Sequence, residues 1–247
     1  MRPSDDQCVP LVIIADAHIS RPKGNSGAFF EMLAALGQGA GDVVFLGDIF
    51  DLWIALPRYE DALHGRFLSW CQQQKTRRRV GFIEGNHEFF IPRGHVDAFT
   101  WCTHQAWRQD AEGNLFCHGD RINRLDRSYL AFRKLIKNPI ARTLIDGLPW
   151  GPHLVHRVKE GMKGTNQAFR KSLPHEQLRQ FAEGRFREGA VRIFLGHFHQ
   201  AFHYQAAPGR DLYTLPDWHS AGWVSVLSGD RADLRQGAWR DLLPVKS

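Results

Sequence analysis

The stretch VRIFLGHFH, residues 191–199, joins an apolar, β-like run to a glycine and two histidines, His197 and His199. A short apolar run that ends in glycine and polar residues predicts a buried strand leading into a loop. Alternate residues of an extended chain point to the same side, so the His-x-His spacing places the two imidazoles together. The stretch therefore predicts a polar site at the end of a buried strand, although two imidazoles on an exposed strand would show the same spacing.

Four more stretches repeat this arrangement of an apolar run followed at once by polar residues, usually with a glycine. They are LVIIADAH at 11–18, DVVFLGDIFDLW at 42–53, VGFIEGNHEFF at 80–90 and LFCHGD at 115–120. Helical patterns span residues 26–36, about 60–75 and about 96–107. Strands that alternate with helices predict a layered α/β fold whose functional loops gather at one edge of the sheet.

The ends of the five predicted strands carry one kind of side chain: carboxylates, imidazoles and a single amide. The set is Asp16, His18, Asp48, Asp51, Asn86, His87, His118, His197 and His199. Such groups bind Mn²⁺, Fe²⁺ or Zn²⁺, and the lack of thiolates argues against a cysteine-type structural zinc. The set is large enough for two ions, with Asp48 as the expected bridge. Two divalent ions can stabilise a displacement at phosphorus and lower the pKa of water.

The length and the cysteines point to one intracellular domain. At 247 residues and 28.3 kDa, the chain can bury a full core without disulfides, and we expect a single domain over residues 1–247 with an insertion. The four cysteines show no Cys-x-x-Cys pair, which favours a reducing compartment. The first apolar run is too short for a secretory signal, and acidic residues precede it. No apolar run is long enough to span a membrane. We expect a cytoplasmic protein.

The positive charge is concentrated in one segment. The formal net charge is +6, but residues 121–192 contain sixteen Lys or Arg against six Asp or Glu, a balance of +10. The rest of the chain therefore has a balance of −4. Basic segments attract nucleic acid, anionic membranes or phosphorylated substrates, and composition does not choose among them.

The motifs D-x-H, G-D-x-x-D, G-N-H-E, H-G-D and G-H-x-H occur here in that order, as DAH, GDIFD, GNHE, HGD and GHFH. This order resembles the calcineurin-like metallophosphoesterase family from about residue 11 to residue 199. The resemblance implies a β-sandwich flanked by helices and a dinuclear metal centre. One ion would be bound by Asp16, His18, Asp48 and His199, and the other by Asp48, Asn86, His118 and His197.

The resemblance also implies roles beyond the metal ligands. His87 would stabilise the leaving oxygen or the phosphoryl charge, and Asp51 would orient His87, although Asp51 is equally suited to cap a helix. We expect Mn²⁺ first, with Fe²⁺ and Zn²⁺ open, because all three accept histidine and carboxylate ligands.

The region between HGD and GHFH is an insertion of about 75 residues, far more than two strands need as a connection. It predicts two or more amphipathic helices over 121–190, interrupted near KNP and GLPWGP, with apolar residues interleaved with Arg and Lys. A lid that is apolar on one face and basic on the other suits a substrate with acyl chains and phosphates. A helical hairpin that only packs on the sandwich is the alternative.

A narrower resemblance is carried by HGDRINRLDRSYLAFR, the basic insertion and the tail DWHSAGWVSV. These stretches look like the UDP-2,3-diacylglucosamine pyrophosphohydrolase subfamily of the lipid A pathway. That resemblance implies water attack on the α-phosphorus, which releases UMP and 2,3-diacylglucosamine 1-phosphate from a lipid-linked UDP-sugar. It also implies a protein bound to the anionic cytoplasmic face of the inner membrane. The expected substrate contacts are Asp126, Tyr129 and Arg133, with Arg157 and Lys171 as phosphate contacts.

Two positions depart from that subfamily. GNHEF has His87 where the subfamily has arginine, and GDIFD has Asp51 where it has glutamate. Both differences favour the general phosphoesterase pattern, which leaves soluble nucleotides, other nucleotide-sugars and phosphoproteins open as substrates. A scaffold protein would be expected to have lost ligands, and this chain keeps them all. We expect no nucleic-acid partner, and no oligomeric state is predicted.

Overall fold

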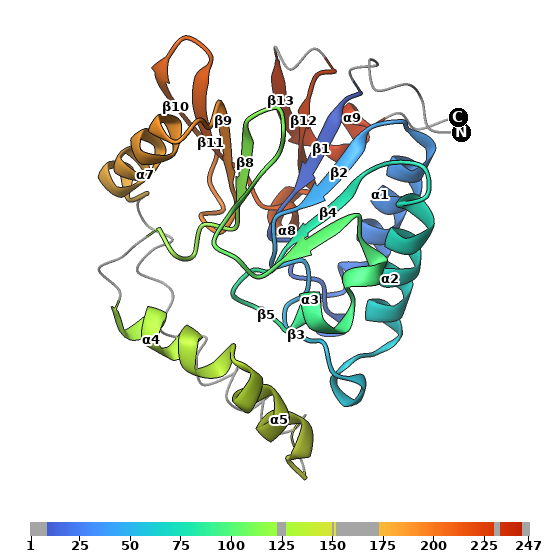
Figure 1. Ribbon diagram of the computed structural model, residues 1–247. Coiled ribbons are helices and arrows are strands. Elements are labelled where there is room, and N and C mark those ends of the chain that lie inside the picture. The colour runs from blue at the N-terminus through green and yellow to red at the C-terminus, as the bar shows by residue number, and fades with distance from the viewer. Residues whose placement is uncertain (1–8, 123–126, 150, 152–172, 230–232, 244–247) are drawn as a thin grey trace.

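Two β-sheets stack face to face in the computed structural model, and helices cover the outer face of each sheet (Figure 1). The structure describes residues 9–122, 127–149, 151, 173–229 and 233–243. The six-stranded sheet has the order β13-β12-β1-β2-β4-β6, and the five-stranded sheet has the order β10-β11-β9-β8-β7. The predicted sandwich flanked by helices is confirmed.

The six-stranded sheet has a parallel half and an antiparallel half. Its parallel strands are β1 (Leu11–Ile14), β2 (Asp42–Phe45), β4 (Val80–Ile83) and β6 (Trp101–Thr103). The antiparallel strands β12 (Trp223–Leu227) and β13 (Leu234–Ala238) extend the sheet beyond β1. Parallel strands need long crossover connections, which here contain the helices.

The five-stranded sheet has parallel strands at its centre. These are β8 (Asn114–Cys117), β9 (Arg192–Leu195) and β11 (Arg210–Thr214), with β7 (Arg108–Gln109) and β10 (Phe202–Ala207) antiparallel at the edges. A separate parallel pair consists of β3 (Trp53–Ile54) and β5 (Glu88–Phe89). The short helices are η1 (Arg21–Lys23), η2 (Pro57–Tyr59), α3 (Ile91–Gly94), η3 (Val96–Ala98), α8 (Trp218–Ala221) and α9 (Trp239–Leu242).

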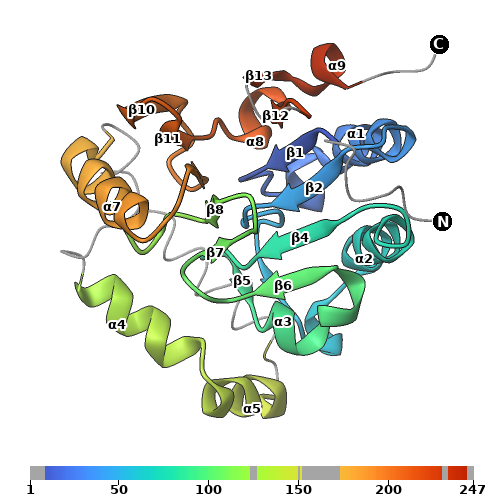
Figure 2. The ribbon, with the colours of Figure 1, turned by 45° about the horizontal axis from the view of Figure 1, so that its top comes forward.

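Alternation along β1 shows how the layers form. Leu11 and Ile13 pack between the sheets with residues of β8 and β9, whereas Val12 and Ile14 pack against α1 (Ser26–Gln38) and α2 (Ala62–Gln74). On the other side, α7 (His175–Arg187) covers the five-stranded sheet. Both views place these helices on opposite outer faces (Figures 1 and 2). The two sheets are therefore fixed relative to each other by a shared core.

The helices predicted over 26–36 and 60–75 correspond to α1 and α2, but the helix predicted over 96–107 is wrong. Only η3 forms there, and the chain continues as β6 and β7. Trp101 lies beside Gly81 of β4, where a Cβ on Gly81 would come within 2.1 Å of the indole. The indole fills the space that the glycine leaves. The segment therefore pairs with β4 as an edge strand, although its sequence has a helical periodicity.

Two helices of the predicted insertion lie outside the two sheets, below α3 and β5 in Figure 1. They are α4 (Arg127–Ile136) and α5 (Pro139–Gly147). Tyr59 of η2 donates a hydrogen bond to the carbonyl oxygen of Ile145 at 2.8 Å, and Arg58 donates to the carbonyl oxygens of Asp146 and Leu148. These contacts satisfy the free carbonyl groups at the end of α5 and attach it to the core.

The bounds of the insertion, 121–190, stay a prediction, because residues 150 and 152–172 lie outside the described chain. Within the described residues, no helix is long and apolar enough to cross a membrane.

Candidate functional site

The carboxyl ends of strands from both sheets meet at one place and bring together the side chains predicted as ligands. Asp16 and His18 follow β1, Asp48 follows β2, Asn86 and His87 follow β4, His118 follows β8, and His197 and His199 follow β9. Strands β1, β2 and β4 run parallel to one another in the first sheet, and β8 and β9 run parallel in the second, so within each sheet these loops leave at the same edge.

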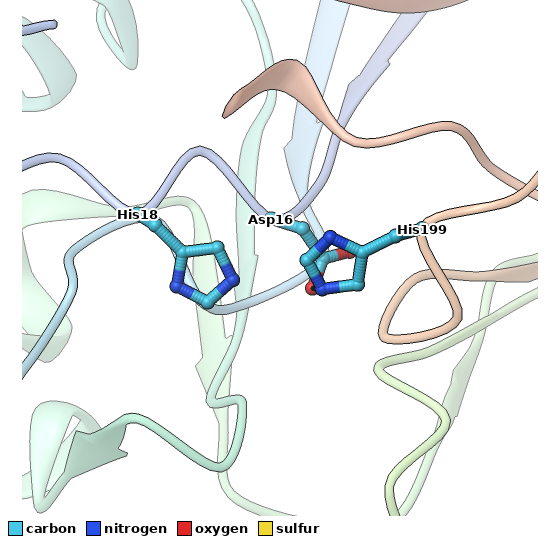
Figure 3. A group of neighbouring side chains, drawn as sticks. All are labelled: Asp16, His18 and His199. Atoms are coloured by element: carbon cyan, nitrogen blue, oxygen red, sulfur yellow. Dashed lines mark ion pairs between the residues drawn. The ribbon is translucent and has the colours of Figure 1, made fainter. Parts of the chain in front are cut away.

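One group consists of Asp16, His18 and His199, which Figure 3 shows side by side. One potential ligand atom from each residue lies within 4.8 Å of the others. His199 Nε2 is 3.5 Å from Asp16 Oδ1, and the His18 and His199 rings are stacked with centroids 5.3 Å apart. These three side chains could hold one divalent ion.

A second group consists of Asp48, His118 and His197, again with one potential ligand atom each within 4.8 Å. His118 Nε2 is 3.5 Å from Asp48 Oδ2. The side-chain oxygen of Asn86 lies 2.9 Å from His118 Nε2 and 3.0 Å from His197 Nδ1. The four side chains thus face a common point and could hold a second ion.

His87 and Asp51 form a third such group with His18, with one potential ligand atom from each residue within 4.8 Å of the others. The His87 ring nitrogen Nδ1 is 2.8 Å from the main-chain carbonyl oxygen of Asp51, and Nε2 is 3.8 Å from Asp48 Oδ2. The Asp51 carboxylate lies 3.0 Å from Lys23 Nζ. The hydrogen bond that orients His87 therefore comes from the backbone of Asp51, and a role for its carboxylate stays a prediction.

The backbone is strained at the candidate ligands. In the described chain, six non-glycine residues have positive φ, and five of them are Asp16, His18, Asp48, His197 and His199, with φ between 45° and 69°. Such conformations cost about 1–3 kcal/mol each and persist only where the surroundings impose them. Here the NH groups of Asp16 and His18 donate to the carbonyl oxygens of Gly47 and Asp48. Strain concentrated in this way marks a functional site.

The glycines of the motifs allow these loops to approach each other. A Cβ on Gly85 would lie 2.3 Å from Asp48 Oδ1, and one on Gly196 would lie 2.9 Å from Asp16 Oδ2. Neither distance is possible for a real side chain, so glycine is required where the carboxylates face the neighbouring loop.

The pKa values of the buried carboxylates and histidines depend on one another. Burial raises the pKa of Asp16, although His199 and His118 oppose this effect. Burial also raises the pKa of Asp48, but His87 and His118 outweigh it and hold the pKa well below its usual range. Burial lowers the pKa of His118, whereas Asp48 raises it to about 10. The carboxylates therefore need positive charge beside them in the folded protein.

The donor atoms fit divalent cations. Asp16 Oδ1 and both ring nitrogens of His18 are buried and make no hydrogen bond within the described chain. Buried polar atoms are nearly always paired, so atoms without a partner at one point indicate a site built for another group. His118 Nδ1 is 2.7 Å from the carbonyl oxygen of Leu46, which fixes the tautomer that leaves Nε2 available as a ligand.

Glu88 is a structural residue of the site for which the sequence predicted no role. Its buried carboxylate accepts hydrogen bonds from the NH groups of Asp48, Ile49 and Gly85, at 2.9, 2.7 and 2.7 Å. Burial and the nearby Asp48 raise the pKa of Glu88 to about 8. Glu88 thereby joins the loop after β2 to the loop after β4. The only signal in the sequence was its place in GNHE.

Asp217 is a second residue that the sequence did not single out. Its carboxylate is 3.5 Å from His199 Nδ1 and accepts hydrogen bonds from Ser220. Burial raises the pKa of Asp217, but His199 and Ser220 outweigh burial and lower it to about 2. An ionised carboxylate behind an imidazole orients the ring and raises its basicity.

The predicted substrate contacts are only partly within the described structure. Arg133 is buried, with Nη1 3.1 Å from Asp120 Oδ2. Tyr129 lies in α4, but its side chain is not among the described ones. Asp126, Arg157 and Lys171 lie outside the described residues. Their roles stay predictions.

Comparisons with known proteins identify the family of the chain. The sequence model of the calcineurin-like phosphoesterase family matches residues 9–201. The UDP-2,3-diacylglucosamine hydrolase of Pseudomonas savastanoi pv. phaseolicola is 24% identical over 87% of this chain and 90% of its own length. The hydrolase of the same name from Actinobacillus succinogenes is 28% identical over 90% of this chain and 96% of its own. A dimetal phosphatase from Danio rerio matches 95% of this chain and 100% of its own, at 12% identity and a TM-score of 0.44.

Proposed function

Because the chain belongs to the calcineurin-like phosphoesterase family, we propose that it hydrolyses UDP-2,3-diacylglucosamine to UMP and 2,3-diacylglucosamine 1-phosphate. The chain is a metal-dependent phosphoester hydrolase, and the proposal adds the substrate. The observation that supports this substrate is that relatives named for it align over 87–90% of the chain.

In this proposal the two groups of ligands hold two ions. Asp16, His18, Asp48 and His199 would hold one ion, and Asp48, Asn86, His118 and His197 would hold the other. Bound divalent cations act as Lewis acids toward phosphoryl oxygens and lower the pKa of water. We propose Mn²⁺, and the same ligands also accept Fe²⁺ or Zn²⁺.

His87 is the proposed acid or charge-stabilising group. Its side chain is 30% exposed, so it can reach a substrate at the mouth of the site. If Nδ1–H donates to the carbonyl oxygen of Asp51, Nε2 is the ring nitrogen left for a phosphoryl or leaving oxygen. We propose that this nitrogen acts in the chemical step and that His87 is not a metal ligand.

The insertion carries the proposed surface for the acyl chains and the membrane. Leu135 of α4 and Ile140 and Leu144 of α5 are 69%, 74% and 65% exposed. Ile140 and Leu144 are four residues apart and share one side of α5. An exposed apolar side in a segment with a charge balance of +10 suits the anionic cytoplasmic face of the inner membrane.

The substrate is tested by product analysis. The protein with Mn²⁺ is incubated with micellar UDP-2,3-diacylglucosamine in H₂¹⁸O, and the products are analysed by mass spectrometry. We expect UMP that contains ¹⁸O, because attack on the α-phosphorus places the solvent oxygen there. The control is Asp48→Ala, which removes the shared ligand and should release no UMP. Hydrolysis of bis(4-nitrophenyl) phosphate without any UMP release would contradict the proposal and favour a soluble substrate.

The role of His87 is tested by His87→Ala. We expect kcat to fall by about 10²–10⁴, as for other acid–base or charge-stabilising groups, while the bound metal content stays that of the unaltered protein. The matched control is His203→Ala on β10, which should leave kcat unchanged. A His87→Ala protein that loses a metal ion would show that His87 is a ligand.

The membrane surface is tested by sedimentation with phosphatidylglycerol vesicles. Replacing both Ile140 and Leu144 by serine should weaken binding by about tenfold or more, because each buried CH₂ contributes about 0.8 kcal/mol. Val96→Ser, which removes an exposed apolar side chain from η3, is the control and should bind normally. Equal binding by the double variant and the unaltered protein would rule out this surface.

A further inference from the structure

We propose that Arg133 and Lys137 of the insertion are positioning residues, which hold the segment that contains Asn86 and His87 in place. The inference rests on the proposed function in one respect, which is that Asn86 is taken as a metal ligand. It assigns Arg133 to the protein interior instead of the substrate contact expected from the sequence.

Arg133 lies in the last turn of α4, and Lys137 directly follows the last residue of the helix, with its NH still donating to the Arg133 carbonyl oxygen. Their side chains are only 6% and 9% exposed, so both extend into the protein. Residues four apart share one face of a helix, and this face of α4 lies against the core. By contrast, Lys134 and Leu135 are exposed on the same helix.

Lys137 binds the backbone on both sides of the Asn86–His87 pair. Its ammonium group donates to the carbonyl oxygens of Gly85 and Glu88 and to Glu84 Oε1, at 3.1 Å from the last. A lysine ammonium has three hydrogens, and these three acceptors use all of them. One side chain therefore fixes the two ends of the short segment that carries Asn86 and His87.

Arg133 connects this segment to the loop of a second predicted ligand. Its Nη1 contacts Asp120 Oδ2 at 3.1 Å and the Gly85 carbonyl oxygen at 3.4 Å. Asp120 follows His118 by two residues, so the guanidinium joins the loops of His118 and Asn86. Those two side chains lie 2.9 Å apart in the site.

The charges in this contact are balanced. Two buried cations, Arg133 and Lys137, face the buried carboxylates of Asp120 and Glu84. Buried charges are tolerated when each is paired, and the attraction between them is strong because water is excluded. The contact is therefore rigid enough to set the position of the backbone that it binds.

The second anchor of the insertion strengthens the inference. Tyr59 and Arg58 attach the end of α5 to the core, whereas Arg133 and Lys137 attach the end of α4. The two helices are thus held at separate points, one of them on the candidate metal centre. It follows that the insertion is a structural part of that centre.

The test compares Lys137→Met with Lys134→Met. Both remove one positive charge from the same helix end, but only Lys137 contacts the segment. We expect Lys137→Met to weaken one of the two Mn²⁺ affinities by about 10–100-fold in calorimetric titration, as is typical when a residue that orients a ligand is lost. We also expect a lower kcat on bis(4-nitrophenyl) phosphate with KM unchanged. Lys134→Met should match the unaltered protein in both.

A second variant separates positioning from misfolding. Lys137→Met combined with Glu84→Gln leaves no unpaired buried charge, so its Tm should approach that of the unaltered protein. The weakened Mn²⁺ affinity should persist in this double variant. Mn²⁺ binding restored to its original strength would overturn the proposal, since the defect would then come from unpaired Glu84.

Arg133→Met distinguishes positioning from substrate contact. Positioning predicts weaker Mn²⁺ binding and slower hydrolysis of both the small aryl ester and the lipid substrate. Normal Mn²⁺ affinity with a loss confined to the lipid substrate would overturn the assignment of Arg133. Mn²⁺ affinity is measured without turnover. If the unaltered protein binds Mn²⁺ but cleaves neither substrate, the proposed function is contradicted, but the positioning role of Arg133 and Lys137 is not.

Discussion

The structure depends on two buried carboxylates, Asp16 and Asp48, that the fold brings to one point from adjacent parallel strands. Like charges buried together destabilise a folded protein unless cations face them. Histidines from the other sheet supply part of this positive charge, and the donor atoms that make no hydrogen bond indicate that metal ions supply the rest. The carboxylates from one sheet therefore depend on cationic groups that loops of the other sheet bring close to them.

The surrounding structure keeps the two carboxylates close together. Positive φ angles at five predicted ligands are sustained by hydrogen bonds between the loops, and the glycines of the motifs allow the close approach. Glu88 joins two of the loops by accepting hydrogen bonds from three NH groups. In our proposal, Arg133 and Lys137 extend this support to the insertion, because both contact the segment that contains Asn86 and His87.

Much of the fold and of the candidate site could be predicted from the sequence, because apolar runs that end in ligand-type residues are local patterns. What could not be predicted depends on contacts between distant residues. The strand at Trp101 forms because Gly81 leaves room for the indole, and Glu88 and Asp217 act through partners that only the folded chain brings close. Arg133 matches a subfamily motif, but a motif does not tell whether its guanidinium faces a substrate or Asp120.

Hydrolysis by this protein should depend on a pair of divalent cations held by loops from five strands. Elemental analysis of the purified, active protein before and after treatment with a chelator measures this dependence. We expect two divalent transition-metal ions per chain, loss of turnover when they are removed, and recovery when Mn²⁺ is added back. Active protein that contains no bound transition metal and is unaffected by the chelator would show that hydrolysis does not depend on such ions.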